Sequence, residues 1–172
     1  MINLPQYKRA IYANETATLE NKYIRLDVHK RNLGWGWGEV YSPSGKLMCV
    51  FEYLGEIMIR DQDIPMRLEA NEVKRESGDF GEQLSFHVKS IIVQEKLNGT
   101  SFANWMRYPF NEHLLEGEVT FTLTSDKPVI YMSYKLSLFS TPMKILFELN
   151  LFYVDYRIGQ TQFLNELSLK LS

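Results

Sequence analysis

The chain has 172 residues, of which 45% are hydrophobic, so we expect a single domain over residues 1–172 with a sizeable buried core. The 19 Lys and Arg residues nearly balance the 21 Asp and Glu residues. The formal net charge of −2 excludes the basic surface that nucleic-acid binding requires. No apolar run is long enough to cross a bilayer, and residues 1–10 lack the apolar segment of a signal peptide. We therefore expect a cytoplasmic protein that contacts neither nucleic acid nor a membrane.

Cysteine and histidine usage argues against a disulfide framework and against a metal centre. The single cysteine, Cys49, lies inside an apolar run, which predicts a buried and unreactive thiol. His29, His87 and His113 are far apart, and none has a second His or Cys at the spacing of metal ligands. No metal and no cofactor are therefore expected.

Apolar residues recur at every second position from Thr16 to Ser172, in runs bounded by Gly, Pro, Asn and Asp. This period is typical of a half-buried β-strand. Residues 68–76 are ambiguous, because their propensities favour a helix while the neighbouring pattern favours a strand, and we favour the strand. In chain order, strands are expected over residues 16–19, 23–29, 33–41, 47–54, 56–61, 68–76, 83–93, 119–123, 130–138, 145–153 and 162–171.

Turn signals separate these strands. The sequence Ser-Pro-Ser-Gly at residues 42–45 predicts a hairpin, since Pro presets the first turn position and Gly permits positive φ. Further turns are expected at residues 78–81 and at Asn98-Gly99, and the one expected helical turn spans residues 111–117. Turns at residues 125–128 and 140–142 predict that the closing strands form a meander.

About nine to twelve strands with almost no helix indicate an all-β fold, either an antiparallel two-layer β-sandwich or a closed calycin-like barrel. We favour the sandwich. Phe86, Phe121, Leu136 and Phe147 are expected in its core. Apolar residues of both parities over residues 146–154 require a further cover, which predicts self-association, a partner module or a second sheet.

The most unusual local sequence is Gly-Trp-Gly-Trp-Gly at residues 34–38. In a strand, Trp35 and Trp37 would project to one face and the glycines would leave the other face bare. One interpretation is an exposed platform on which a sugar ring stacks. The other is that both indoles belong to the core and the glycines permit a bend or close packing.

A second aromatic group, with Trp105 and Arg107 among its members, spans residues 102–110. It could bind a ligand or cap one end of the sandwich. Trp35, Trp37, Trp105 and Arg107 are therefore the candidate ligand-binding residues. No residue is a candidate for catalysis, since neither a nucleophile motif nor a phosphate-binding glycine loop is present.

The order of segments resembles the N-terminal β-supersandwich of α-galactosidase-like and related glycoside hydrolases, which has a galactose-mutarotase-like fold. The segments that carry this resemblance are residues 18–26, the turn at residues 43–47, residues 81–86, residues 115–123 and residues 127–131. In those enzymes the catalytic carboxylates lie on a separate barrel, so the resemblance implies a non-catalytic domain.

Three functions remain open from the sequence. The first is a non-catalytic β-sandwich of the carbohydrate-active-enzyme type that packs on a catalytic module or on a second copy, with a glycan contact through Trp35 or Trp37. The second is a calycin-like barrel that binds an apolar small molecule. The third is an enzyme in its own right.

Overall fold

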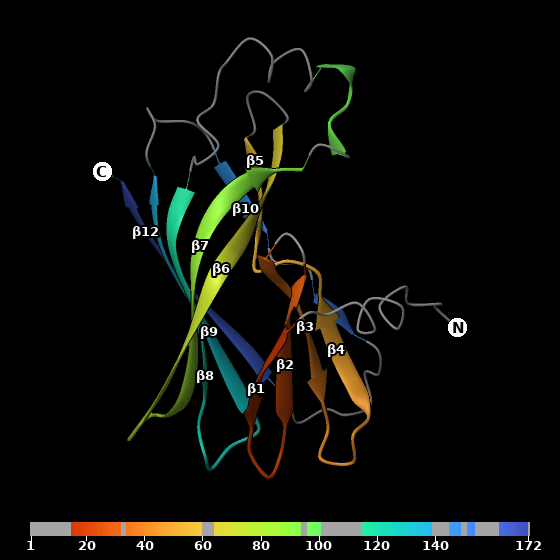
Figure 1. Ribbon diagram of the computed structural model, residues 1–172, viewed down its shortest axis with the longest axis vertical. Helices are drawn as coiled ribbons and strands as arrows, with labels where there is room; N and C mark the ends of the chain where they lie inside the picture. The colour runs from red at the N-terminus through yellow and green to blue at the C-terminus, as the bar shows by residue number, and fades with distance from the viewer. Residues whose placement is uncertain are drawn as a thin grey trace.

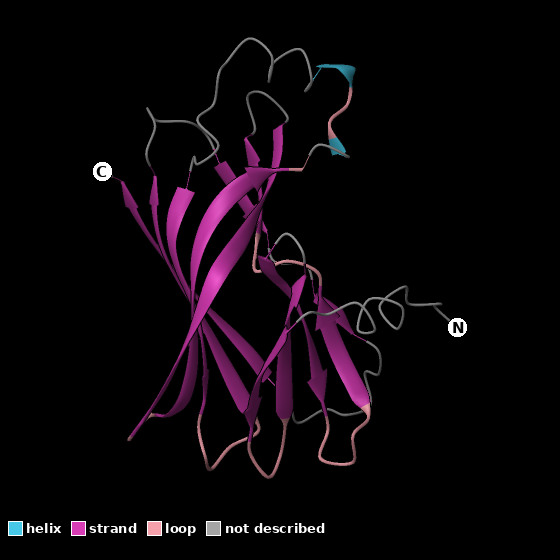
Figure 2. Ribbon diagram, in the orientation of Figure 1, coloured by secondary structure: helices cyan, strands magenta, loops and turns pink. Residues whose placement is uncertain are grey.

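The protein is seen in a computed structural model that describes residues 15–31, 34–59, 64–93, 96–100, 115–138, 145–148, 151–153 and 162–171. These residues form one sheet of twelve strands, and the only helical residues among them are Lys96 and residues 99–100 (Figure 1 and Figure 2). The strands are β1 (Glu15–Glu20), β2 (Arg25–Arg31), β3 (Gly34–Tyr41), β4 (Leu47–Phe51), β5 (Glu56–Ile59), β6 (Ile64–Gly78), β7 (Gly81–Ile92), β8 (Leu115–Leu123), β9 (Val129–Leu138), β10 (Ile145–Glu148), β11 (Leu151–Tyr153) and β12 (Gln162–Leu171).

The main strand order is β1-β2-β3-β6-β7-β8-β9-β12, with β4 beside β3, β5 beside β6, β11 beside β4 and β10 beside β5. All pairs are antiparallel except β9 with β12, which run parallel. In the described part of the chain, no pairing joins the two ends of this order. The sheet is therefore not closed, and the alternative of a calycin-like barrel is wrong.

The sheet folds back on itself, so that β1 to β4 face β7 to β9 across a shared core (Figure 1). Aromatic rings connect the two layers in a chain. Trp35 on β3 contacts Phe86 on β7, with ring centroids 5.7 Å apart, and Phe86 contacts Phe121 on β8 at 5.9 Å. Phe51 on β4 stacks on Phe121 at 5.6 Å. The predicted all-β, sandwich-like architecture is confirmed.

The return of the sheet occurs between β3 and β6, where the backbone pairing is reduced to Trp35 opposite Ala70. Gly34 has φ of 120° there, and a Cβ at that position would lie 2.6 Å from the carbonyl oxygen of Ala70. A residue with a side chain would be both strained and in collision with β6. The pairing register also shifts beside this junction, between His29 and Lys30 on β2 and between Ala70 and Glu72 on β6. Such bulges bend a strand and increase its twist.

Two polar contacts fasten the layers outside the aromatic chain. The side-chain amide nitrogen (Nδ2) of Asn21 lies in the turn between β1 and β2. It donates to the backbone carbonyl oxygens of Thr124 (2.7 Å) and Lys127 (2.8 Å) in the turn between β8 and β9. The buried hydroxyl of Tyr134 on β9 donates to the carbonyl oxygen of Leu54 at 2.9 Å. The Tyr134 contact satisfies a buried backbone carbonyl that would otherwise lack a hydrogen-bond partner.

Several local predictions are confirmed. Residues 42–45 form the hairpin, in which the Ser42 N–H donates to Lys46 and Gly45 has φ of 78°. Residues 68–76 are strand, within β6, and residues 78–81 make the turn into β7. Phe86, Phe121 and Leu136 are buried, whereas the side chain of Phe147 lies outside the described residues.

Three predictions are wrong. Asn98-Gly99 does not form a hairpin turn, because β7 ends at Ile92, β8 begins at Leu115, and Gly99 does not have positive φ. Residues 115–117 belong to β8 and not to a helical turn, while residues 111–114 lie outside the described part. The closing strands do not continue as a meander after β9, since β10 pairs with β5, β11 with β4, and β12 with β9 in parallel. No helix among the described residues combines the length and the apolar character needed to cross a membrane.

Phe121 contacts aromatic rings of both layers, so Phe121→Ala should lower the free energy of unfolding by about 3 to 5 kcal/mol. Urea denaturation followed by circular dichroism measures this change. The matched control is Phe80→Ala, because Phe80 is 43% exposed in the turn after β6 and its truncation should leave stability nearly unchanged. Equal losses in the two variants would contradict the central position of Phe121.

Candidate functional site

The two tryptophans expected to form a sugar platform are buried. Trp35 is 3% exposed and Trp37 is 2% exposed, so neither presents a free indole face. Trp35 belongs to the core, as the alternative interpretation expected, whereas Trp37 is buried outside the core cluster. Trp105 and Arg107 lie outside the described residues.

The tryptophans also do not share a face, which corrects the expectation from strand alternation. The register pairs Trp37 with His29 and Trp35 with Lys30, and the register shift falls between these pairs. Paired residues on neighbouring strands project to the same side of a sheet, and successive residues such as His29 and Lys30 project to opposite sides. The bulge therefore directs Trp35 into the core and Trp37 to the outer face of β1 to β3. Gly36 is the extra residue that makes this reversal.

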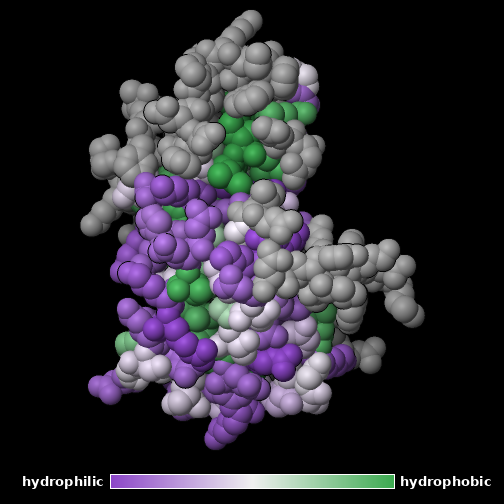
Figure 3. Space-filling view, viewed as in Figure 1, coloured by the Kyte–Doolittle hydropathy of each residue, from purple (hydrophilic) through white to green (hydrophobic). Residues whose placement is uncertain are grey.

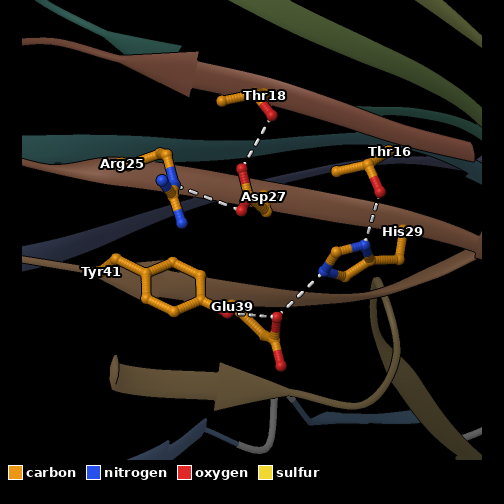
Figure 4. A network of polar contacts seen from close by, with 7 residues as sticks. All are labelled: Thr16, Thr18, Arg25, Asp27, His29, Glu39 and Tyr41. Carbon is orange, nitrogen blue, oxygen red and sulfur yellow. Dashed lines mark hydrogen bonds and ion pairs between the residues drawn. The ribbon is translucent and has the colours of Figure 1, made fainter. Parts of the chain in front are cut away.

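The outer face of β1 to β3 carries a network of polar side chains, shown in Figure 4. At its centre lie His29, 6% exposed, and Glu39, 4% exposed. The His29 Nε2 atom is 3.1 Å from Glu39 Oε2, and the same oxygen accepts the hydroxyl of Tyr41 at 2.6 Å. Thr16 Oγ1 lies 2.8 Å from His29 Nδ1. Side chains from three neighbouring strands thus form one chain of contacts, in which Thr16 reaches the Glu39 carboxylate through His29.

A second group adjoins the first on the same face. Asp27 lies opposite Glu39 in the register, and its carboxylate accepts the Thr18 hydroxyl at 2.7 Å. Arg25 Nε is 3.3 Å from Asp27 Oδ2, and the Arg25 guanidinium lies 4.5 Å from the centre of the Tyr41 ring. Two carboxylates in neighbouring positions would repel each other. The Arg25 guanidinium and the hydroxyls of Thr18 and Tyr41 offset this repulsion.

The electrostatics of the network oppose proton transfer at neutral pH. Burial alone would raise the pKa of the Glu39 carboxyl, but hydrogen bonds from His29 and Tyr41 and the attraction of His29 and Arg25 outweigh it and hold this pKa below its usual value. Burial and the neighbouring Glu39 carboxylate raise the pKa of Tyr41 well above its usual value. Glu39 therefore stays ionised and Tyr41 stays protonated. A carboxyl group that acts as a general acid needs a raised pKa, so that it is protonated at neutral pH.

Trp37 borders this network. Its ring centroid lies 4.2 Å from that of His29. The Arg31 guanidinium, on β2 like His29, lies 4.9 Å from the centroid of the Trp37 ring. The buried Trp37 Nε1–H has no hydrogen-bond acceptor among the described residues. Buried donors without an acceptor are rare in native proteins.

The outer face of the other layer is half-exposed and polar. We call the following outward-facing side chains of β7, β8 and β9 the polar grid, because the sheet register aligns them in rows: Gln83, Thr122 and Tyr131; Ser85, Thr120 and Ser133; His87, Glu118 and Lys135; and Lys89 with Glu116. The side of the molecule seen in Figure 3 is mainly hydrophilic where residues are described, with one hydrophobic patch in its upper part and a smaller one near the middle.

Hydrogen bonds tie neighbouring members of the polar grid. Gln83 Nε2 donates to Thr122 Oγ1 at 2.9 Å, and the hydroxyls of Ser85 and Thr120 are 3.1 Å apart. His87 Nε2 lies 2.7 Å from Glu116 Oε1. Hydroxyl and amide groups fixed in this way can still make further hydrogen bonds, because each retains an unused donor or acceptor position.

The described residues contain no group of three or more His, Cys, Asp or Glu side chains arranged to hold a metal ion. His87 faces Glu116 and His29 faces Glu39, so both histidines of the described ranges have a carboxylate neighbour. Cys49 is buried, as predicted, and burial raises the pKa of its thiol to about 12. This thiol is therefore not a reactive nucleophile.

The sequence did not single out Asp27, His29 and Glu39 together. A signal was present, since Asp27 and His29 alternate with Leu26 and Val28 and therefore share the polar side of β2. Strand alternation does not show that this polar side is buried, and it does not show which residue of β3 faces His29 across a bulge.

No family model matches the chain, and neither a curated protein nor a solved structure matches it. The resemblance to the β-supersandwich of α-galactosidase-like enzymes therefore stays a prediction from the sequence.

The lowered pKa of Glu39 makes part of the stability depend on pH. A carboxyl group whose pKa is lower in the folded state stabilises the fold above its unfolded pKa, about 4.5, and this contribution is lost as the pH falls through the folded value. Wild type should therefore exceed Glu39→Gln in stability at neutral pH, and the difference should shrink in acid. Urea denaturation between about pH 3 and pH 7 measures it.

The control for this experiment is Glu76→Gln at the exposed end of β6, which removes one carboxylate without a buried partner. Its stability difference from wild type should stay small over the same range. A Glu39→Gln difference that does not change with pH would contradict the role given to the ionised carboxylate.

Proposed function

We propose that this chain is a non-catalytic β-sandwich module of the carbohydrate-active-enzyme type, which binds a glycan through the polar grid on the outer face of β7 to β9. The observation that carries the proposal is the alignment of hydroxyl, amide and ionic side chains in register across three strands. Sugars are recognised through many hydroxyl groups that both donate and accept hydrogen bonds. A rigid sheet holds complementary groups at fixed spacing and so lowers the entropic cost of binding.

The accessibility of the grid favours it over the tryptophans as the contact surface. Grid members such as Gln83, Thr120 and Tyr131 keep part of their surface in solvent, whereas Trp35 and Trp37 are buried. The tyrosine of the grid, Tyr131, lies in the same row as Gln83 and Thr122. An aromatic ring beside an amide and a hydroxyl combines an apolar surface with polar anchors, as small-ligand sites commonly do.

The state of the buried network supports a role without catalysis. Its carboxylate is held ionised by His29 and Tyr41, and its members are used in contacts with one another. In the proposed function this network stabilises the layer formed by β1 to β3. The module would act in the cytoplasm and pack on a catalytic module or on a second copy of the chain.

The proposal is tested by titrating ¹⁵N-labelled protein with gluco-, galacto-, manno- and xylo-oligosaccharides at millimolar concentrations. Amide shifts are expected along β7 to β9 for at least one series, with weak affinity, because a shallow surface offsets little of the cost of ordering a ligand. The double variant Gln83→Ala/Thr120→Ala should weaken binding about tenfold, since it removes two or more hydrogen bonds.

The control is Asp126→Ala, an exposed position in the turn between β8 and β9 and away from the grid, which should bind as wild type does. Thermal unfolding of all variants separates a loss of binding from a loss of folding. If no oligosaccharide shifts the amides of β7 to β9, the proposed glycan surface is wrong.

A further inference from the structure

The C-terminal strand β12 occupies one end of the sheet. It pairs in parallel with β9 along its whole length, from Gln162 opposite Val129 to Leu171 opposite Leu138. Among the described residues, no strand pairs with its other edge. Alternate residues of this ten-residue strand therefore offer their N–H and C=O groups on that side.

Open edges in natural proteins usually carry features that prevent pairing with another chain, such as short length, proline, bulges or unfavourable charges. The edge strand β12 has no proline, and its pairing with β9 runs without a register shift. The opposite end of the sheet differs. Strand β1 has six residues, and full antiparallel pairing of two copies of β1 would place Glu15 opposite Glu20.

The sequence of β12 is self-complementary in one antiparallel register. When two copies pair about Ser168, position 166 of one copy lies opposite position 170 of the other. Glu166 then faces Lys170 twice across the two-fold axis, and Leu167 faces Leu169 twice. Opposite charges and apolar residues in directly opposed positions stabilise paired strands, whereas like charges destabilise them.

We propose that two copies of this chain associate through β12, paired antiparallel about Ser168, so that the two sheets form one continuous sheet across a two-fold axis. The partner is a second copy because a two-fold interface uses the same surface on both subunits and needs a self-complementary sequence. The proposed function includes packing on a second copy of the chain, and this inference identifies β12 as the surface through which the two copies pack. It does not depend on glycan binding, so the two proposals can fail separately.

The first test places a cysteine on the axis. In Ser168→Cys the two new thiols would lie in directly opposed positions, at a Cα separation that a disulfide can span. Mild oxidation of the full chain should give a covalent dimer on non-reducing gels. The matched control is Ser133→Cys on β9, one strand further from the axis, which should stay uncrosslinked. The native Cys49 is buried and does not compete.

The second test reverses the charges. Glu166→Lys and Lys170→Glu each place like charges opposite each other, so each should raise the dimer dissociation constant about tenfold or more in sedimentation experiments at micromolar concentrations. The double variant restores opposite charges and should recover the wild-type constant. Lys74→Glu on β6 is an exposed control away from β12 and should leave the dissociation constant unchanged.

Recovery in the double variant together with the specific crosslink would support the β12 interface. A wild-type chain that stays monomeric would overturn it. A dimer that resists both single charge reversals and does not crosslink through residue 168 would place the interface elsewhere and would also overturn it.

Discussion

The fold depends on the place where a single sheet turns back on itself, between β3 and β6. Only Trp35 and Ala70 pair there, and Gly34 lies so close to Ala70 that no side chain fits between the strands. A sheet with full pairing at this point would continue in one layer and leave the apolar side of each strand in water. Reduced pairing and a bulge on each side let the twist accumulate until the layers face each other. The hydrophobic effect then stabilises the turned arrangement.

The same junction determines which tryptophan lies on each face of the layer formed by β1 to β4. The bulge at Gly36 sends Trp35 inward to Phe86, where it joins the ring chain between the layers, and sends Trp37 outward to His29. The interior of the sandwich thus contains one indole, and the outer face contains the other, which packs against the His29 ring beside Glu39. Burying Glu39 would cost free energy without its hydrogen bonds to His29 and Tyr41. The bulge at Gly36 therefore also determines which side chains surround the buried Glu39 carboxylate.

Period-two alternation predicted the strands well because burial on one side of a sheet imposes it directly, as with Leu84, Phe86 and Val88 on β7. The hairpin at residues 42–45 was predictable because its turn chemistry is local. The relative orientation of Trp35 and Trp37 was not, since one extra residue reverses parity and a glycine alone does not reveal a bulge. The parallel pairing of β12 with β9 could not be predicted either, because it depends on residues far apart in the sequence. The alternation of apolar residues does not show whether two strands run parallel or antiparallel.

The two polar surfaces differ in how much bonding capacity remains for a ligand. In the buried network, one oxygen of Glu39 already accepts from His29 and Tyr41, and Asp27 accepts from Thr18 while facing Arg25. Any ligand there would have to break contacts that offset the cost of burying charge. On the polar grid, the hydroxyl and amide groups remain partly in solvent and keep unused donor or acceptor positions, so a ligand would mainly replace water and not protein contacts. Sequence could identify polar positions on both faces. Only the packing of the layers decides which of them stay available for binding.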